Sequence, residues 1–143
     1  MTRKKKVQAS KEVHVRTYAL AAVAALAVAF GGTQSAFAGG AHTVKVTAGK
    51  PSEFKFAVSN THLGLGTVTF TVTNAGAIVH DFKVCSAPST GAKTTCIGKG
   101  TSKLSPHHST TMTVKFTKAG TYAYLCTVPG HAAAGMKGTF KVS

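Results

Sequence analysis

The segment Cys126-Thr-Val-Pro-Gly-His131-Ala-Ala-Ala-Gly-Met136 decides the fold of this 143-residue chain. It brings a thiol, an imidazole and a thioether into eleven consecutive residues, although the whole chain has only three cysteines and three methionines. Alternating apolar and polar residues lie on both sides of it, at 121–126 and at 138–142. A strand, a loop and a second strand in this order predict a hairpin whose loop can turn all three side chains toward one point.

The same alternation recurs through residues 39–143 and predicts an all-β fold. Val, Thr, Phe and Tyr dominate the alternating runs, as in strands with one buried face. Turn-forming residues such as Pro51, Gly76 and Gly120 separate the runs, and none of the runs carries a helical repeat. Many short strands at this spacing favour an antiparallel sandwich or barrel. The expected strands are 43–47, 53–58, 67–73, 79–84, 110–116, 121–126 and 138–142.

Residues 1–38 have the three parts of a secretory signal peptide. A basic head is followed by an apolar run at 18–30, and Ala36-Phe37-Ala38 is a small-x-small cleavage signal. Cleavage after Ala38 would leave 39–143 as one domain without an integral membrane span. It would be exported to the periplasm, the cell surface or the extracellular space. The alternative is a retained membrane anchor, for which the alanine-rich run is short and weakly apolar.

The charge of the chain is strongly one-sided. Residues 39–143 contain eleven lysines and only two acids, Glu53 and Asp81, which gives a formal charge of +9. Such a charge favours acidic partners or anionic surfaces, unless the lysines serve only to solvate the protein. We expect no nucleic-acid partner, because the lysines are scattered singly, this part contains no arginine, and export removes the usual target.

The three cysteines are an odd number, so at least one of them has no disulfide partner within the chain. Cys85 and Cys96 flank a polar loop, and in an exported protein they are predicted to pair. Cys126 then remains for separate chemistry.

A second imidazole would complete a ligand set with Cys126, His131 and Met136. His80 offers one, at the start of the expected strand 79–84. Two histidines, one cysteine and a long axial methionine are the ligands of a blue-copper electron-transfer site. Taken singly, each residue has an ordinary alternative, since a cysteine or methionine is often core and a histidine is often surface. The combination, in this order, favours copper.

With these motifs the chain resembles the cupredoxins, the small blue-copper proteins related to plastocyanin, azurin and auracyanin. The resemblance covers 42–143, and the Cys-x4-His-x4-Met spacing is closest to auracyanin. It implies a Greek-key β-sandwich of about seven to eight strands that holds one Cu(I)/Cu(II) ion. The implied ligands are His80, Cys126, His131 and Met136. The matching motifs are Asn74-x-Gly76-x3-His80, Gly120-x-Tyr122-x-Tyr124-x-Cys126, Pro129-Gly130-His131 and Gly135-Met136-Lys137-Gly138-Thr139.

One residue departs from the family pattern. Many members carry asparagine after the first histidine ligand, where it helps to tie the two ligand loops together, and this chain has Asp81. A carboxylate there could still accept a backbone N–H from the loop of Cys126. Its charge could lower the reduction potential of the copper without abolishing binding.

The function that follows is electron transfer rather than catalysis. Four protein ligands leave no open position for a substrate. Multicopper oxidases and copper nitrite reductases need further histidine ligands in His-x-His or similar patterns and a second domain, and the sequence shows neither. The alternative is a copper-handling protein, but such proteins usually have methionine-rich or histidine-rich tracts.

The resemblance also implies how the protein meets its partners. His131 would be the edge through which electrons leave. Its small apolar neighbours Val128, Pro129 and 132–134 would form a patch for brief docking. We expect a monomer whose redox partner is an acidic cytochrome or oxidase surface.

Overall fold

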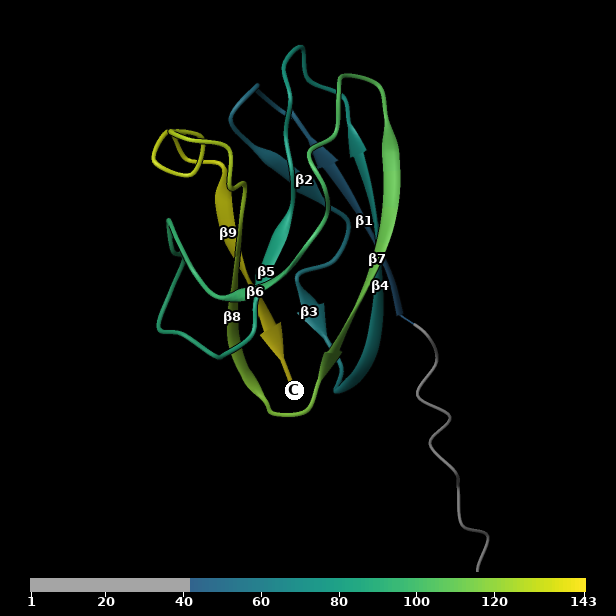
Figure 1. The fold of residues 1–143 in the computed structure, drawn as a ribbon. Coiled ribbons are helices and arrows are strands. Elements are labelled where there is room, and N and C mark those ends of the chain that lie inside the picture. Colours follow the sequence, from purple (N-terminus) through teal and green to yellow (C-terminus); the bar gives the residue numbers. More distant parts are fainter. Residues whose placement is uncertain (1–41) are drawn as a thin grey trace, which may run out of the picture. The chain divides into compact units, whose positions relative to one another are not determined.

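The computed structural model describes residues 42–143, which form two β-sheets packed face to face (Figure 1). One sheet has the strand order β2-β1-β4-β7 and the other β3-β9-β8-β5-β6. The expected Greek-key β-sandwich is therefore confirmed. The expected signal peptide, 1–38, lies outside the described residues. The strands are β1 (His42–Ala48), β2 (Phe56–Val58), β3 (His62–Leu63), β4 (Gly66–Asn74), β5 (Lys83–Cys85), β6 (Gly98–Gly100), β7 (Ser109–Phe116), β8 (Gly120–Leu125) and β9 (Lys137–Val142).

Nine strands are present in residues 42–143, where seven to eight were expected. The two that the sequence did not reveal are β3 and β6, of two and three residues. A segment of that length is too short to show an alternating pattern. Both lie at the edges of the five-stranded sheet.

The sheets are mixed, although the alternation favoured an antiparallel sandwich. β1 pairs with β4 in parallel along its whole length, and β3 pairs with β9 in parallel. Parallel neighbours need a crossover connection. Here the chain leaves the first sheet after β2, adds β3 to the second sheet, and returns as β4 in the direction of β1.

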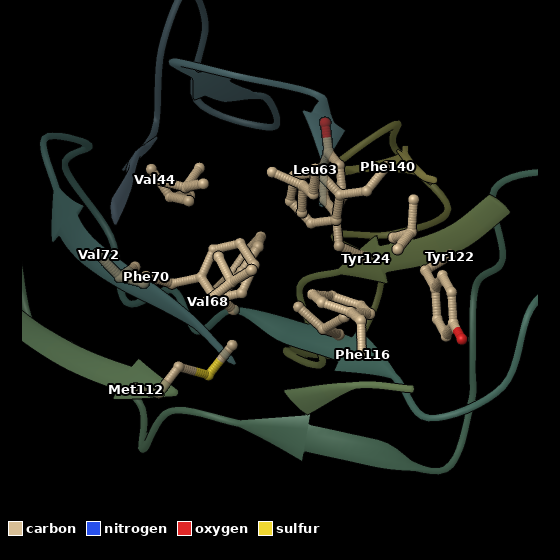
Figure 2. Close-up of a cluster of buried hydrophobic side chains, with 14 of the residues drawn as sticks. Val44, Leu63, Val68, Phe70, Val72, Met112, Phe116, Tyr122, Tyr124 and Phe140 are labelled. Atoms are coloured by element: carbon tan, nitrogen blue, oxygen red, sulfur yellow. The ribbon is translucent and has the colours of Figure 1, made fainter. Parts of the chain in front are cut away.

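The hydrophobic core lies between the two sheets and follows the predicted alternation (Figure 2). Along β4, Val68, Phe70 and Val72 are buried, and the threonines between them are more exposed. Phe82 lies at the centre, with ring centroids 5.2 to 5.6 Å from those of Phe56, Tyr124 and Phe70. Such aromatic pairs add to the free energy gained by burying their area.

Two expected strands are shorter or displaced. The run 79–84 becomes β5 only from Lys83 onward. His80 lies before β5, in an isolated bridge with Leu104. The backbone N–H of Phe82 donates to the Thr101 hydroxyl and not to a backbone carbonyl, and regular pairing with β6 begins at Lys83. The run 53–58 likewise becomes β2 only from Phe56 onward.

The Cys85–Cys96 disulfide is present and ties β5 to the loop before β6. This pairing was predicted from the sequence. Cys126 is the one free cysteine among the described residues, and it is buried. Within the same residues, no helix has the length and apolar character needed to cross a membrane.

Candidate metal centre

His80, Cys126 and His131 come together at the end of the sandwich where a loop joins β8 to β9 (Figure 1). His80 Nδ1 is 3.1 Å from His131 Nδ1, and Cys126 Sγ is 3.5 Å from the same nitrogen. One ligand atom from each residue lies within 4.8 Å of the others, and all three side chains are buried. The structure thus brings together three of the four predicted ligands.

Backbone hydrogen bonds fold the 126–136 loop back on itself. The Cys126 N–H donates to the Met136 carbonyl at 3.0 Å, and the Met136 N–H donates to the His131 carbonyl at 2.9 Å. Gly130 and Gly135 have φ values of 82° and 108°, which side chains disfavour. The glycines therefore let the loop turn tightly enough to bring Cys126 and His131 together.

Met136, the fourth predicted ligand, is fully buried directly before β9. It packs in a small cluster with Cys126 and Ala48. The thioether therefore lies on the thiol side of the site. Its role as an axial ligand stays a prediction.

Glu53 fixes the orientation of the His80 ring. Its Oε1 lies 2.8 Å from His80 Nε2. A carboxylate can only accept, so Nε2 carries the proton and Nδ1 keeps a lone pair directed at His131 and Cys126. The backbone N–H groups of Ala77 and Ile78 also donate to Glu53, at 3.0 and 3.2 Å. The Ala77 N–H, followed by His80, lowers the pKa of Glu53 below its ordinary value.

Asp81 links the two segments that carry the donors. Its carboxylate accepts hydrogen bonds from the backbone N–H and the hydroxyl of Thr127. Its own N–H points at Cys126 Sγ, 3.5 Å away. The expectation that an aspartate could still accept a backbone N–H from the Cys126 loop is confirmed.

The pKa shifts of Cys126 and His131 bear on how the site binds a metal ion. Burial raises the pKa of the Cys126 thiol to about 11, so the thiol keeps its proton at neutral pH until a metal displaces it. Burial, and then the neighbouring His80, lower the pKa of His131, which keeps this imidazole neutral and able to bind a metal. Two imidazoles, a thiol and a thioether form a set that suits copper and not Mg²⁺ or Ca²⁺.

Residues 42–143 match the family described as copper binding proteins, plastocyanin/azurin family. The chain belongs to this family. The cupredoxin resemblance is thereby confirmed, and the cofactor is one type 1 copper, for which the His–Cys–His group of this structure provides the donors expected.

Solved structures agree with the family. An auracyanin from Roseiflexus castenholzii is 26% identical, with a TM-score of 0.54 over 71% of this chain and 96% of that one. Rusticyanin from Thiobacillus ferrooxidans is 31% identical, with a TM-score of 0.54 over 71% of this chain and 76% of that one. Auracyanin A from Chloroflexus aurantiacus, a "blue" copper protein, is 24% identical with a TM-score of 0.54 over 71% and 98%, and supports the fold alone. No curated protein sequence matches the chain.

Three residues of this cupredoxin site were not found from the sequence. Glu53 and Thr127 are the hydrogen-bond partners described above, and Phe54 packs edge-on against His131 with ring centroids 5.1 Å apart. A signal for Glu53 did exist, since it and Asp81 are the only acids after residue 38. The remaining histidines of the described part are exposed and lie outside the donor group, namely His42, His62, His107 and His108.

The surface beside His131 differs in two respects from the patch expected. Pro129, Ala133 and Ala134 are exposed, but Ala132 is buried in a separate small cluster with Leu125. Val128 is partly buried and packs against Cys126 and Met136. Ala132 faces inward because the loop turns after His131. Phe54, 37% exposed, adds apolar surface beside the His131 ring instead.

Proposed function

We propose that this protein is an exported carrier of single electrons whose type 1 copper is held by His80, Cys126, His131 and Met136. The observation that carries the proposal is the buried group of three donors, with His80 Nδ1 and Cys126 Sγ at 3.1 and 3.5 Å from His131 Nδ1. Hydrogen bonds within the fold hold these donors in place. Such a site needs little rearrangement when an electron arrives or leaves.

When bound, the copper supplies a centre that alternates between Cu(II) and Cu(I). The residues of the chain hold this centre still and exclude water from it. Cys126 and His131 are fixed by the loop hydrogen bonds, and His80 is fixed by Glu53 and by its bridge to Leu104. Because all of the proposed ligands are buried, the copper has no open side for a substrate, so we propose no enzymatic role.

Electrons would leave through His131. This side chain is 7% exposed and lies under Phe54, near the exposed Pro129, Ala133 and Ala134. We define these four neighbours as the exit patch. A small apolar surface of this kind suits the brief encounters of redox proteins. The lysine-rich charge favours an acidic partner, such as a cytochrome or an oxidase surface, and the carrier itself would be a monomer.

Export rests on the sequence of residues 1–38 and on the disulfide. The head, the apolar run and the Ala36-Phe37-Ala38 site form a signal that is removed on secretion. The Cys85–Cys96 disulfide suits an oxidising compartment. The mature protein would then begin near residue 39, outside the membrane.

The visible and paramagnetic-resonance spectra of the copper-loaded protein test the proposal. A type 1 centre gives intense colour from thiolate-to-copper charge transfer, and we expect rapid reversible reduction by a small electron donor. A colourless Cu(II) protein would exclude the blue-copper site. A coloured protein that exchanges electrons with no redox protein would favour the copper-handling alternative.

A further inference from the structure

The two acids of the described chain both lie at the copper site, each bonded to a different one of the two segments that carry the donors. Asp81 binds Thr127, on the cysteine side, and Glu53 binds His80. Eleven lysines and no other carboxylate side chain occupy the rest of 42–143. Asp81 stands where many family members have asparagine, and it links the two ligand segments as that asparagine does. Glu53 is the acid at this site that still has no assigned role.

The loop opposite Glu53 is shaped to receive a carboxylate. The Asn74 side chain accepts from the Gly76 N–H at 2.9 Å and donates to the carbonyls of Ile78 and Leu104, both at 2.8 Å. These bonds hold the loop so that the Ala77 and Ile78 N–H groups point at Glu53. A carboxylate held by two amides and an imidazole is a strong, charge-assisted arrangement.

Gly76 provides the space for this contact. A Cβ at this position would collide with Glu53 Oε1 and would lie 2.8 Å from His80 Nε2. The glycine therefore lets the carboxylate and the ring meet over the loop backbone. Glu53 is 24 or more residues away in sequence from the groups that it binds, so the contact belongs to the folded structure and not to a local turn.

We propose that Glu53 is a positioning residue for the copper, which acts through His80 and lowers the reduction potential. The proposal rests on the proposed function, because it takes His80 as a copper ligand. The carboxylate holds the proton on Nε2 and keeps the Nδ1 lone pair directed at the metal. A hydrogen-bonded carboxylate makes the imidazole a better electron donor, which stabilises Cu(II) more than Cu(I).

The negative charge of Glu53 alone would also favour Cu(II). The test must therefore separate this charge effect from the effect of the hydrogen bond to His80. Glu53 is 31% exposed, and solvent therefore screens part of its charge. Glu53→Gln removes the charge but keeps an oxygen that can accept from Nε2. Glu53→Ala removes both. Ser52→Lys, at an exposed neighbouring position, changes the net charge by the same amount as Glu53→Gln and leaves the His80 contact intact.

The reduction potentials of the wild type and the three variants are measured together with their colour. We expect Glu53→Gln to lower the ratio of Cu(II) to Cu(I) affinity about tenfold, which is about 59 mV upward for a one-electron couple. Glu53→Ala should shift the potential further, and Ser52→Lys should shift it much less. Potentials that are unchanged in both Glu53 variants, or that rise equally in Glu53→Gln and Ser52→Lys, would overturn the proposal.

Nitrogen-15 NMR of the metal-free protein gives a second readout that does not depend on copper. The wild type should show His80 with its proton on Nε2, and Glu53→Ala should show a mixture of the two neutral forms. A wild-type His80 protonated on Nδ1 would contradict the role of Glu53, even in a blue protein. A colourless wild type with the expected Nε2 proton would instead contradict the copper ligation, so the two failures can be told apart.

Discussion

Cys126 and Asp81 show how single residues at this site combine burial with a fixed partner. Cys126 is 1% exposed and receives the Asp81 N–H at its sulfur. The Asp81 carboxylate accepts both polar hydrogens of Thr127. Each group is therefore held by the segment that carries the other. We expect a substitution of either residue to change the colour or the reduction potential of the copper more than it changes the fold.

Replacing the sulfur tests the ligand assignment. We expect Cys126→Ser to abolish the blue colour, because a hydroxyl gives no thiolate-to-copper charge transfer. The fold should persist, since serine has nearly the same size. Met136→Gln should keep the colour and lower the potential, because the axial ligand tunes it. Absorption spectra measure the colour, circular dichroism measures the fold, and a redox titration followed by absorption measures the potential. A blue Cys126→Ser protein would show that the thiolate lies elsewhere.

Changing Asp81 separates its charge from its hydrogen bonds. Asp81→Asn keeps an oxygen for the Thr127 N–H and removes the negative charge, so the potential should rise with little loss of stability. Asp81→Ala leaves two polar groups of Thr127 without their partner and should cost about 1–3 kcal/mol. Denaturant unfolding of the metal-free proteins measures the cost. Equal stability of the alanine variant and the wild type would mean that the link does not hold the loops together.

At the scale of strands and loops, the local sequence pattern identified five strands and the loop that carries Cys126 and His131. β1, β4, β7, β8 and β9 were predicted to within about two residues from their alternating sequence pattern. β4 alternates between core and surface in the structure, whereas the last four residues of β8 are all buried. The loop 126–136 was predicted as a hairpin connection that carries Cys126, His131 and Met136, since sequence spacing is enough for a hairpin.

Elements whose form depends on distant partners were not predictable in the same way. His80 leaves the expected strand because it pairs with Leu104, and β2 begins late, after Glu53 has turned toward His80. β6 is three residues long and pairs with β5. None of these contacts leaves a periodic signal, because each joins segments more than 12 residues apart in the sequence.

The loop that faces Glu53 should tolerate no side chain at Gly76. Gly76→Ala places a methyl group against Glu53 and His80, and overpacking of this kind costs about 1–3 kcal/mol. We also expect weaker copper binding, because the ring must move. Gly91→Ala is the matched control, since a Cβ at Gly91 meets nothing within 4 Å. Copper titration and thermal unfolding would contradict the steric argument if the two variants behaved alike.

The disulfide should stabilise the edge of the five-stranded sheet without affecting the copper. It closes a short loop, with a sequence separation of 11 between Cys85 and Cys96. Replacing both cysteines by alanine should cost about 2–4 kcal/mol, in the usual range for such a loop. The blue spectrum should remain. Thiol labelling of the unfolded metal-free wild type should find one thiol, and three labelled thiols would mean that the disulfide does not form.

For the whole molecule, we expect the encounter with a redox partner to depend more on where the charges lie than on the net charge. Both acids after residue 38 bind groups at the copper site, so the lysines elsewhere in the described part have no carboxylate to offset them. Lys55 lies beside the 126–136 loop, with Nζ 3.5 Å from the Gly135 carbonyl oxygen. Lys118, by contrast, lies between β7 and β8, at the end of β8 remote from Cys126 (Figure 1).

This contrast predicts how the encounter with a partner depends on salt. Steering acts over about one Debye length, roughly 10 Å at 0.1 M ionic strength, so charges near the exit patch count most there. The rate of electron transfer to an acidic cytochrome should fall as salt is added, and the rate to a basic cytochrome should rise.

Lys55→Gln should lower the rate with the acidic partner and flatten its salt dependence, and Lys118→Gln should do so much less. Stopped-flow rates over a salt series measure these effects. Equal effects of the two substitutions would mean that the lysines act only through net charge, and rates independent of salt would leave docking to the apolar patch alone.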